Sequence, residues 1–349
     1  MLSVCMIVKN EADNLKLTLP QLVKHAAEVI VVDTGSTDAT VETAKNLGAR
    51  VLHFDWINDF AAARNYSLSF AAQPWIIWLD ADEYMKEEDI EQLNRTLAKA
   101  DQAVQAYEVI LTESPYKQTV RGSSYSRVKV FRNNIGIHFE RPINEQVADS
   151  DGGISRGESL PIVIYHWGRF LNDEKMTAKK ERYFRMYREY LNQKPDDPYV
   201  NFLLGNLLRE TGDPDGALRA YEKTIANCGN DHNVKVNALT RKAEFELKNG
   251  KYKESFASAS QIIALEPENA AAKNIVATLL VAVGKTDMAI QVLEEHLKSK
   301  FQSVDPVREQ VIPRVILADA YGKIGNSEKA EWYKEKAKEL EEGLNAGPK

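Results

Sequence analysis

Residues 75–83 read WIIWLDADE, an uninterrupted apolar run that is followed at once by acidic side chains. The five apolar residues Trp75–Leu79 predict a strand buried on both faces, as in a parallel sheet. Asp80, Asp82 and Glu83 then fall at the carboxyl end of that strand, where such sheets bind ligands. In an extended segment Asp80 and Asp82 would project to the same side, because side chains two residues apart share a face. This stretch therefore predicts an α/β fold with an acidic group at its ligand-binding edge.

The sequence before residue 75 alternates predicted strands with predicted helices. The strands are Ser3–Val8, Glu28–Asp33 and Arg50–Phe54, and two of the helices are Val41–Leu47 and Phe60–Ala72. Polar residues again stand where strands end, namely Asn10, Glu11 and Asp33. Because the carboxyl ends of parallel strands meet at one edge, we expect these residues to line one cleft with Asp80 and Asp82.

The sequence from Gln102 to Arg169 changes to shorter β-like stretches, which we expect to complete the sheet as antiparallel strands and to carry loops. A second polar cluster lies among them and contains His138, Glu140, Arg141, Glu145 and His166. A lone histidine inside an apolar strand, such as His166, is more often a core residue than a ligand. For Arg64, similarly, the interpretation from spacing alone is a surface arginine, although its guanidinium would suit a phosphate.

The chain becomes helical after about Asn172, and a weak repeat begins there. Gly212, Gly250, Gly284 and Gly325 recur at intervals of 38, 34 and 41 residues. The middle interval equals the tetratricopeptide period, and the other two allow short insertions. A plain helical bundle remains the alternative. We expect domains at 1–172 and 196–349, joined by a connecting helix at 173–195.

The composition is that of a cytoplasmic globular protein of 349 residues. The formal net charge of −6 argues against a nucleic-acid-binding protein. The basic run 175–188 indicates a solvated helix face, with a phosphate or anionic membrane surface as the alternative. The two cysteines are too few for a disulfide framework, and no secretory signal or apolar run of membrane-spanning length is evident.

The carboxylates after Leu79 also predict a metal site. Two hard oxygen ligands, here Asp80 and Asp82, suit Mg²⁺ or Mn²⁺, which keeps waters and binds substrate phosphates. Asp33 could accept hydrogen bonds from a base or a ribose, or it could simply belong to the turn that starts the next helix.

Three segments carry a family resemblance: SVCMIVKNEADNL at Ser3–Leu15, VVDTGSTDAT at Val31–Thr40 and WIIWLDADE at Trp75–Glu83. With these motifs the chain resembles family-two glycosyltransferases of the GT-A fold, an α/β fold with a Rossmann-like mixed sheet. It is most similar to the branch with C-terminal tetratricopeptide repeats, which includes bacterial peptide and protein glycosyltransferases. The resemblance covers about the first 170 residues; the helical part matches only in type.

The resemblance implies an inverting enzyme that uses a UDP-sugar, with a hexose or an N-acetylhexosamine, and Mn²⁺ or Mg²⁺. By residue it implies that Asp33 contacts uridine, that Asp80 contacts ribose or metal, that Asp82 holds the metal, and that Arg64 contacts the diphosphate. Asn10 and Glu11 would line the same donor site. His166, two residues before Gly168, is similar to a late family histidine that completes the metal site.

The resemblance also implies a general base on the acceptor side. The family often has His-Glu-Gln where this chain has Asn144-Glu145-Gln146, so Glu145 matches the base but the histidine is missing. Glu140 is the alternative base. We expect a peptide or protein acceptor that binds the repeats, or repeats that pair two subunits. The alternatives are an enzyme acting on lipopolysaccharide core or another surface glycan, and an inactive scaffold.

Overall fold

The structure is a computed structural model that describes residues 2–115, 118–119, 124–149, 158–167, 173–299 and 306–346. It consists of two compact units, Met1–Lys179 and Lys180–Lys349, whose boundary falls inside α5, Asp173–Gln193. The expected domain limit at residue 172 lies outside the described residues, and the three-part division stays a prediction. Each unit is described by itself.

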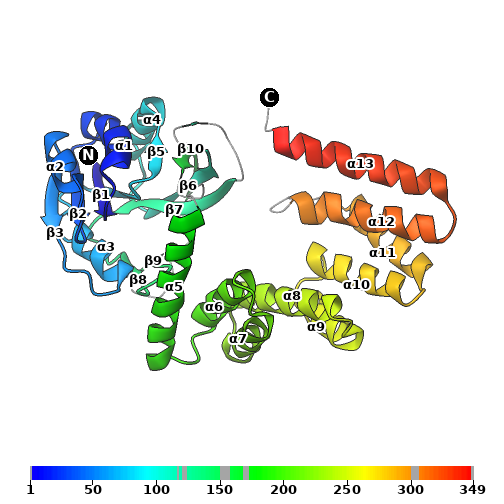
Figure 1. The fold of residues 1–349 in the computed structure, drawn as a ribbon. Coiled ribbons are helices and arrows are strands. Elements are labelled where there is room, and N and C mark those ends of the chain that lie inside the picture. Colours follow the sequence, from blue (N-terminus) through cyan, green and yellow to red (C-terminus); the bar gives the residue numbers. More distant parts are fainter. Residues whose placement is uncertain are drawn as a thin grey trace. The chain divides into compact units, whose positions relative to one another are not determined.

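In its described residues, the N-terminal unit contains a mixed sheet, four complete helices and the beginning of α5 (Figure 1). The strands are β1 Leu2–Val8, β2 Glu28–Asp33, β3 Arg50–His53, β4 Trp75–Leu79, β5 Glu83–Met85, β6 Ala106–Glu113, β7 Ser124–Arg132 and β10 Glu158–His166. Among the described residues, these eight strands form one sheet in the order β3-β2-β1-β4-β7-β6-β10-β5. The strands β8 His138–Glu140 and β9 Gln146–Ala148 form a separate pair. The helices are α1 Ala12–His25, α2 Thr40–Asn46, α3 Phe60–Leu68 and α4 Glu87–Leu97.

The first four sheet strands confirm the predicted parallel arrangement. β1 pairs in parallel with β2 and β4, and β2 pairs in parallel with β3. Alternate residues of these strands face opposite layers, as strand geometry requires. Val4 and Met6 pack with α1, α2 and α4, whereas Cys5 and Trp78 pack with α3 and β8. Helices on both faces explain why the strands are apolar throughout.

The rest of the sheet departs in part from the predicted antiparallel pattern. β7 is antiparallel to both β4 and β6, as expected, but β10 runs parallel to β6. β5 is an edge strand antiparallel to β10, so Glu83 begins a strand where the sequence suggested only a polar strand end. Helix α4 was not predicted, although Ile90, Leu93 and Leu97 have helical spacing and are buried. The predicted helix Phe60–Ala72 ends earlier, at Leu68.

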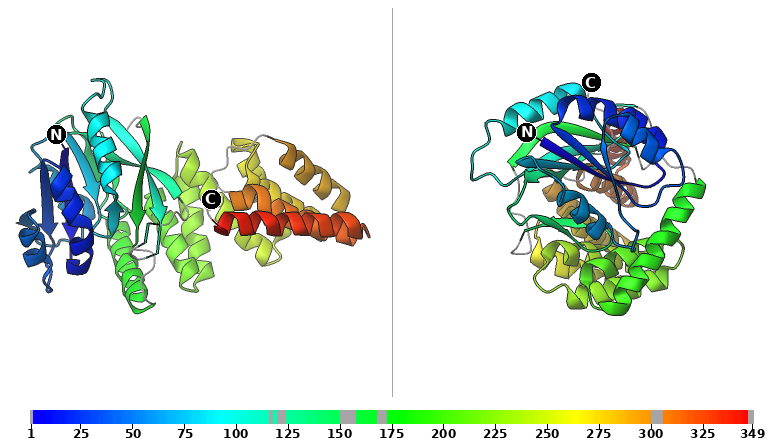
Figure 2. Two further views of the ribbon diagram at one scale, coloured as in Figure 1. Left: turned by 90° about the horizontal axis from the view of Figure 1, so that it is seen from above. Right: turned by 90° about the vertical axis from the view of Figure 1, so that its left-hand side faces the viewer.

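The C-terminal unit is helical throughout its described residues, as two further views show (Figure 2). Besides α5, its helices are α6 Pro198–Glu210, α7 Pro214–Asn227, α8 His232–Lys248, α9 Tyr252–Leu265, α10 Ala270–Ala282, α11 Thr286–Lys298, α12 Ile312–Lys323 and α13 Ser327–Ala346. A short π-helix, Val307–Val311, precedes α12. No helix within the described residues has the length and apolar character needed to cross a bilayer.

The four repeating glycines explain the pairing of these helices. Gly212, Gly250, Gly284 and Gly325 follow α6, α8, α10 and α12, and each has a φ between +71° and +87°. This left-handed conformation suits glycine and ends a helix by letting the next amide bond back to the last turn, as Lys285 N does to Leu280 O at 2.8 Å. Each glycine therefore ends the first helix of a pair and reverses the chain so that the second helix can pack against it. This arrangement produces the tetratricopeptide-like repeat that the sequence predicted.

Candidate functional site

The segment after β4 turns sharply instead of continuing as a strand. The amide of Glu83 donates to Asp80 O at 3.0 Å, and the Glu83 carboxylate accepts from the amide of Asp80 at 3.0 Å. These bonds close a turn, so the expectation that Asp80 and Asp82 project together is wrong. Asp80 instead contacts Arg64, while Asp82 lies near His166. The two aspartates belong to two different groups of charged side chains.

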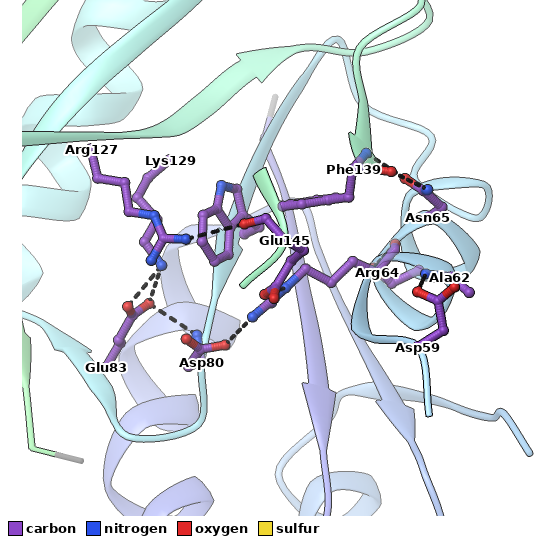
Figure 3. Close-up of polar contacts among 12 residues, drawn as sticks. Asp59, Ala62, Arg64, Asn65, Asp80, Glu83, Arg127, Lys129, Phe139 and Glu145 are labelled. Atoms are coloured by element: carbon purple, nitrogen blue, oxygen red, sulfur yellow. Dashed lines mark hydrogen bonds and ion pairs between the residues drawn. The ribbon is translucent and has the colours of Figure 1, made fainter. Parts of the chain in front are cut away.

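The first group, which we call the inner network, consists of Arg64, Asp80, Glu83, Lys129 and Glu145. Arg64 lies on α3 and is almost fully buried. Its Nη2 donates to Asp80 Oδ1 and its Nε to Glu145 Oε1, both at 2.6 Å (Figure 3). Burial by itself raises the pKa of Asp80, but the charges of Arg64 and Lys129 hold that pKa well below its usual range. Arg64 thus bridges the end of β4 to the segment that carries Glu145.

Lys129 and Glu83 form the deepest part of the inner network. Lys129, on β7, is 0% exposed, and its Nζ lies 2.7 Å from both carboxylate oxygens of Glu83. The same Nζ lies 3.4 Å from the ring centroid of Trp78. Burial lowers the pKa of Lys129 and raises that of Glu83, because it disfavours both charged forms. Because Glu83 also accepts a hydrogen bond from the Asp80 amide, its ion pair with Lys129 holds the turn in place.

The second group, which we call the outer group, consists of Asp82, Glu113 and His166. His166 Nε2 lies 3.5 Å from Asp82 Oδ2, and Nδ1 lies 3.2 Å from Glu113 Oε2. Burial by itself lowers the pKa of His166, but the hydrogen bond and charge of Asp82 raise it to about 9. His166 is thus partly buried with carboxylates near both ring nitrogens, and its role as a metal ligand stays a prediction.

The outer group offers ligands for a metal without forming a complete cage. Within the described residues, no cluster of three or more His, Cys, Asp or Glu is arranged to hold an ion. Asp82 Oδ2 and His166 Nε2 nevertheless face each other, while Glu113 accepts from the other ring nitrogen as carboxylates do behind metal-bound histidines. A divalent ion that takes its other ligands from water and substrate phosphates fits this donor set.

Helix α3 is clamped to the segment that carries Glu145. Asn65 and Phe139 exchange two hydrogen bonds, of 2.8 and 2.7 Å, and the amide of Phe60 donates to Pro142 O at 2.8 Å. The Asp59 side chain caps the helix by accepting from the Ala62 amide at 2.8 Å. These bonds fix where Arg64 meets Glu145.

The two candidate bases are placed differently by this arrangement. Glu145 lies inside the inner network and is 8% exposed. Glu140 is exposed on β8, where its carboxylate lies 3.4 Å from His138 Nε2. No contact between Glu140 and the inner network occurs among the described residues.

The loops after β1 and β2 are bonded to each other. The Asn10 side chain accepts from the Thr37 amide at 2.7 Å, and the Glu11 amide donates to Thr40 Oγ1 at 2.7 Å. Asp33 is 4% exposed and accepts from the amides of Gly35 and Ser36. Asp33 therefore orders its own turn, as one of its two sequence interpretations predicted, and its contact with uridine stays a prediction.

The sequence reasoning missed Lys129, Glu113 and Arg127 as members of this region. Arg127 and Lys129 are two apart on β7 and face Trp78, with 4.6 Å from Arg127 Cζ to the ring centroid. Arg127 and Lys129 alternate with apolar residues in β7, and this pattern could have indicated cations on one face of a strand. Such cations need anionic partners, because charged residues are rarely buried unless paired. Nothing in the sequence named Glu83 as the partner.

Comparisons with known proteins agree with this architecture. Residues 3–153 match the model of the family described as Glycosyl transferase family 2. A TPR repeat-containing protein of Synechococcus elongatus is 33% identical over 258 residues, which cover 71% of this chain and 62% of that protein. The SPbeta prophage-derived glycosyltransferase SunS of Bacillus subtilis is 26% identical over 251 residues, which cover 70% and 58%. The chain thus spans about three-fifths of the length of these curated relatives.

One similar solved structure is the crystal structure of MamA. It is 19% identical and covers 51% of this chain and 99% of its own, with a TM-score of 0.39. A likeness this distant carries no conclusion about the present chain.

Proposed function

Since residues 3–153 belong to glycosyl transferase family 2, we propose that this protein transfers a hexose or N-acetylhexosamine from a UDP-sugar to a peptide or protein side chain. The observation that carries the proposal is the pair of charged groups at the end of β4. One group is held by short ion pairs, and the other presents Asp82 and His166 at the sheet edge. Parallel sheets bind nucleotide ligands at this edge.

In this proposal Asp82 and His166 hold Mn²⁺ or Mg²⁺, and Glu113 orients the imidazole. The bound ion would supply positive charge to the diphosphate of the donor. Asp80 and Asp33 belong to the nucleoside side of the site, with the bonded loops of Asn10 and Glu11 beside them. Lys129 and Glu83 keep the Asp80–Glu83 turn in place beneath the donor.

Glu145 is the general base of the proposal, and the transfer inverts the anomeric centre. Its Oε1 is bonded to Arg64, whereas its Oε2 makes no hydrogen bond within the described part of the chain. That second oxygen can accept the proton of an acceptor hydroxyl or thiol as the new bond to the sugar forms. The exposure of Glu140, compared with the burial of Glu145 beside Arg64, favours Glu145 over Glu140.

The acceptor assignment rests on the helical repeats. Tandem helix pairs present extended surfaces that bind peptides and protein segments. We therefore propose that the C-terminal unit recruits a polypeptide acceptor, with self-association through the repeats as a second role.

The proposal is tested by supplying the purified protein with UDP-sugars and Mn²⁺ and measuring released UDP. Peptide and glycolipid acceptors are then compared by intact-mass analysis. We expect donor hydrolysis and a mass increase on peptides. Transfer to glycolipids alone would assign the enzyme to surface glycans, and the absence of hydrolysis and transfer with every donor would indicate a scaffold without activity.

A further inference from the structure

Three cationic side chains surround the indole ring of Trp78, and they differ in their anionic partners. Arg64 Cζ lies 4.5 Å from a ring centroid of Trp78, Lys129 Nζ 3.4 Å and Arg127 Cζ 4.6 Å. Arg64 is paired with Asp80 and Glu145, and Lys129 is paired with Glu83. No ion pair between Arg127 and a carboxylate occurs among the described residues. Arg127 is thus the cation of this region that makes no direct ion pair with a described carboxylate.

The position of Arg127 places that charge at the edge of the sheet where the donor is proposed to bind. β4 and β7 are antiparallel, with Trp75 opposite Arg132 and Ile77 opposite Val130. Continuing along the two strands brings Arg127 toward Asp80, and the charge of Arg127 contributes to the low pKa of Asp80. Figure 3 shows the Arg127 side chain next to Lys129 and directed toward Glu145.

The hydrogen bonds of Arg127 leave most of its donors available. Its Nη2 donates to the backbone oxygen of Glu145 at 3.5 Å, which is long for an N–H···O bond. A guanidinium has five N–H donors and stays charged at any physiological pH. A half-buried guanidinium with one weak bond is suited to binding an oxyanion in a bidentate manner.

We propose that Arg127, and not Arg64, binds the diphosphate of the donor and stabilises the nucleoside diphosphate as it leaves. The inference rests on the proposed glycosyl transfer. Arg64 is only 5% exposed and already pairs with Asp80 and Glu145, and giving up either pair for a diphosphate would leave a buried carboxylate without its partner, which is costly. Arg127 can bind an anion without breaking any ion pair of the described residues.

Arg127 would assist the transfer step itself. The bond from the acceptor oxygen or sulfur to C1 forms while the bond from C1 to the diphosphate oxygen breaks. The electron pair of the broken bond stays on that diphosphate oxygen, and the acceptor proton passes to Glu145. Arg127 lies where its positive charge offsets the negative charge that develops on the leaving diphosphate.

The chain offers a matched control in Arg132, on the same strand. Arg132 Cζ lies 4.4 Å from a ring centroid of Trp75, and the guanidinium donates to Val104 O at 2.7 Å and Asp101 O at 2.6 Å. Arg132 therefore repeats the tryptophan stacking and carbonyl bonding of Arg127 at the opposite end of β4. Arg132→Gln removes the same kind of charge without touching the proposed donor site.

The experiment measures dissociation constants of UDP and of uridine by calorimetry, in Mn²⁺, for the wild type, Arg127→Gln, Arg127→Lys and Arg132→Gln. We expect Arg127→Gln to weaken UDP binding by about 10- to 100-fold and to leave uridine binding unchanged, because only UDP carries the anion. Arg127→Lys should keep part of the difference in affinity between UDP and uridine, and Arg132→Gln should keep all of it.

The ratio of the two affinities within each variant makes the result independent of folding yield. A partly unfolded preparation reduces the apparent number of sites for both ligands and leaves that ratio intact. An Arg127→Gln protein with the wild-type ratio overturns the inference while the proposed function stands. A wild type that binds neither UDP nor uridine overturns the proposed function and this inference with it.

Discussion

The inner network and the outer group at the end of β4 differ in how completely their charges are paired. In the inner network, Arg64 and Lys129 each contact carboxylates at 2.6–2.7 Å, and the side chains of both are at most 6% exposed. In the outer group, His166 and Asp82 are separated by 3.5 Å and are 22% and 27% exposed. Short pairing with buried cations therefore fixes the shape of the site, while the more loosely paired outer group remains available to a ligand.

The largest effect on activity is expected in the outer group. Asp82→Asn should reduce transfer by about 10³-fold or more, since a bound metal typically contributes several kcal/mol to stabilising developing charge. The fold should be retained, because the loose and partly exposed Asp82–His166 pair contributes little to stability. Transfer assays and thermal unfolding of the same preparation check both statements. Near wild-type transfer, with or without a chelator, would remove the metal from the mechanism.

Glu145 belongs to the paired inner network and is also the proposed base, so it shows whether a paired residue can take part in the reaction. Glu145→Gln should lower turnover by about 10²- to 10⁴-fold, the range typical of a lost general base. UDP binding should change little, since Glu145 lies on the acceptor side. Steady-state kinetics and calorimetry measure the two quantities separately. Weakened UDP binding with normal turnover would favour Glu140 as the base.

The inner network is tested through Lys129. Lys129→Met should destabilise the protein by about 3–5 kcal/mol, because it leaves the Glu83 carboxylate buried without its cation. Denaturant unfolding measures the change. The double variant Glu83→Gln/Lys129→Met should recover much of the loss, because it buries no unpaired charge. Additive losses in the double variant would show that the two residues act independently.

The smallest expected effect is the stabilisation of the protein by added Mn²⁺, which tests the outer group alone. Mn²⁺ at about 100 times its dissociation constant should stabilise the wild type by about 2.7 kcal/mol. The stabilisation should disappear in Asp82→Asn, which lacks a proposed ligand, and persist in Arg132→Gln, which keeps the outer group. Thermal unfolding with and without Mn²⁺ gives the comparison, and equal stabilisation of wild type and Asp82→Asn would place the ion elsewhere.

The regular elements of the N-terminal unit were largely predictable. β2 and β4 have the predicted bounds, because four or five consecutive apolar residues between polar ones have few other solutions in a globular fold. The glycine pattern likewise predicted the helix pairs, since a positive φ is a local requirement. The parallel pairing of β10 with β6 was not predictable in this way, because strand order depends on contacts between distant segments.

The candidate site was predictable in its residue types but not in its pairing. Asp80, Asp82, Glu145 and His166 were all recognised, whereas the partner of each was not. The ion pairs join residues 16, 46 and 81 positions apart, and local spacing carries no information on such distances. The assumption that Asp80 and Asp82 share a face failed because a turn, stabilised by Glu83, replaced the extended segment.

The sequence by itself determined the α/β unit, the helical repeats and the acidic end of β4, because these follow from local periodicity and from the backbone preferences of single residues. Only the tertiary structure decided that Arg64 joins Asp80 to Glu145, that Lys129 lies buried beneath the turn, and that Arg127 makes no direct ion pair among the described residues. The physical reason is that electrostatic pairing depends on distance in space, which the chain sets only once its distant strands are packed together.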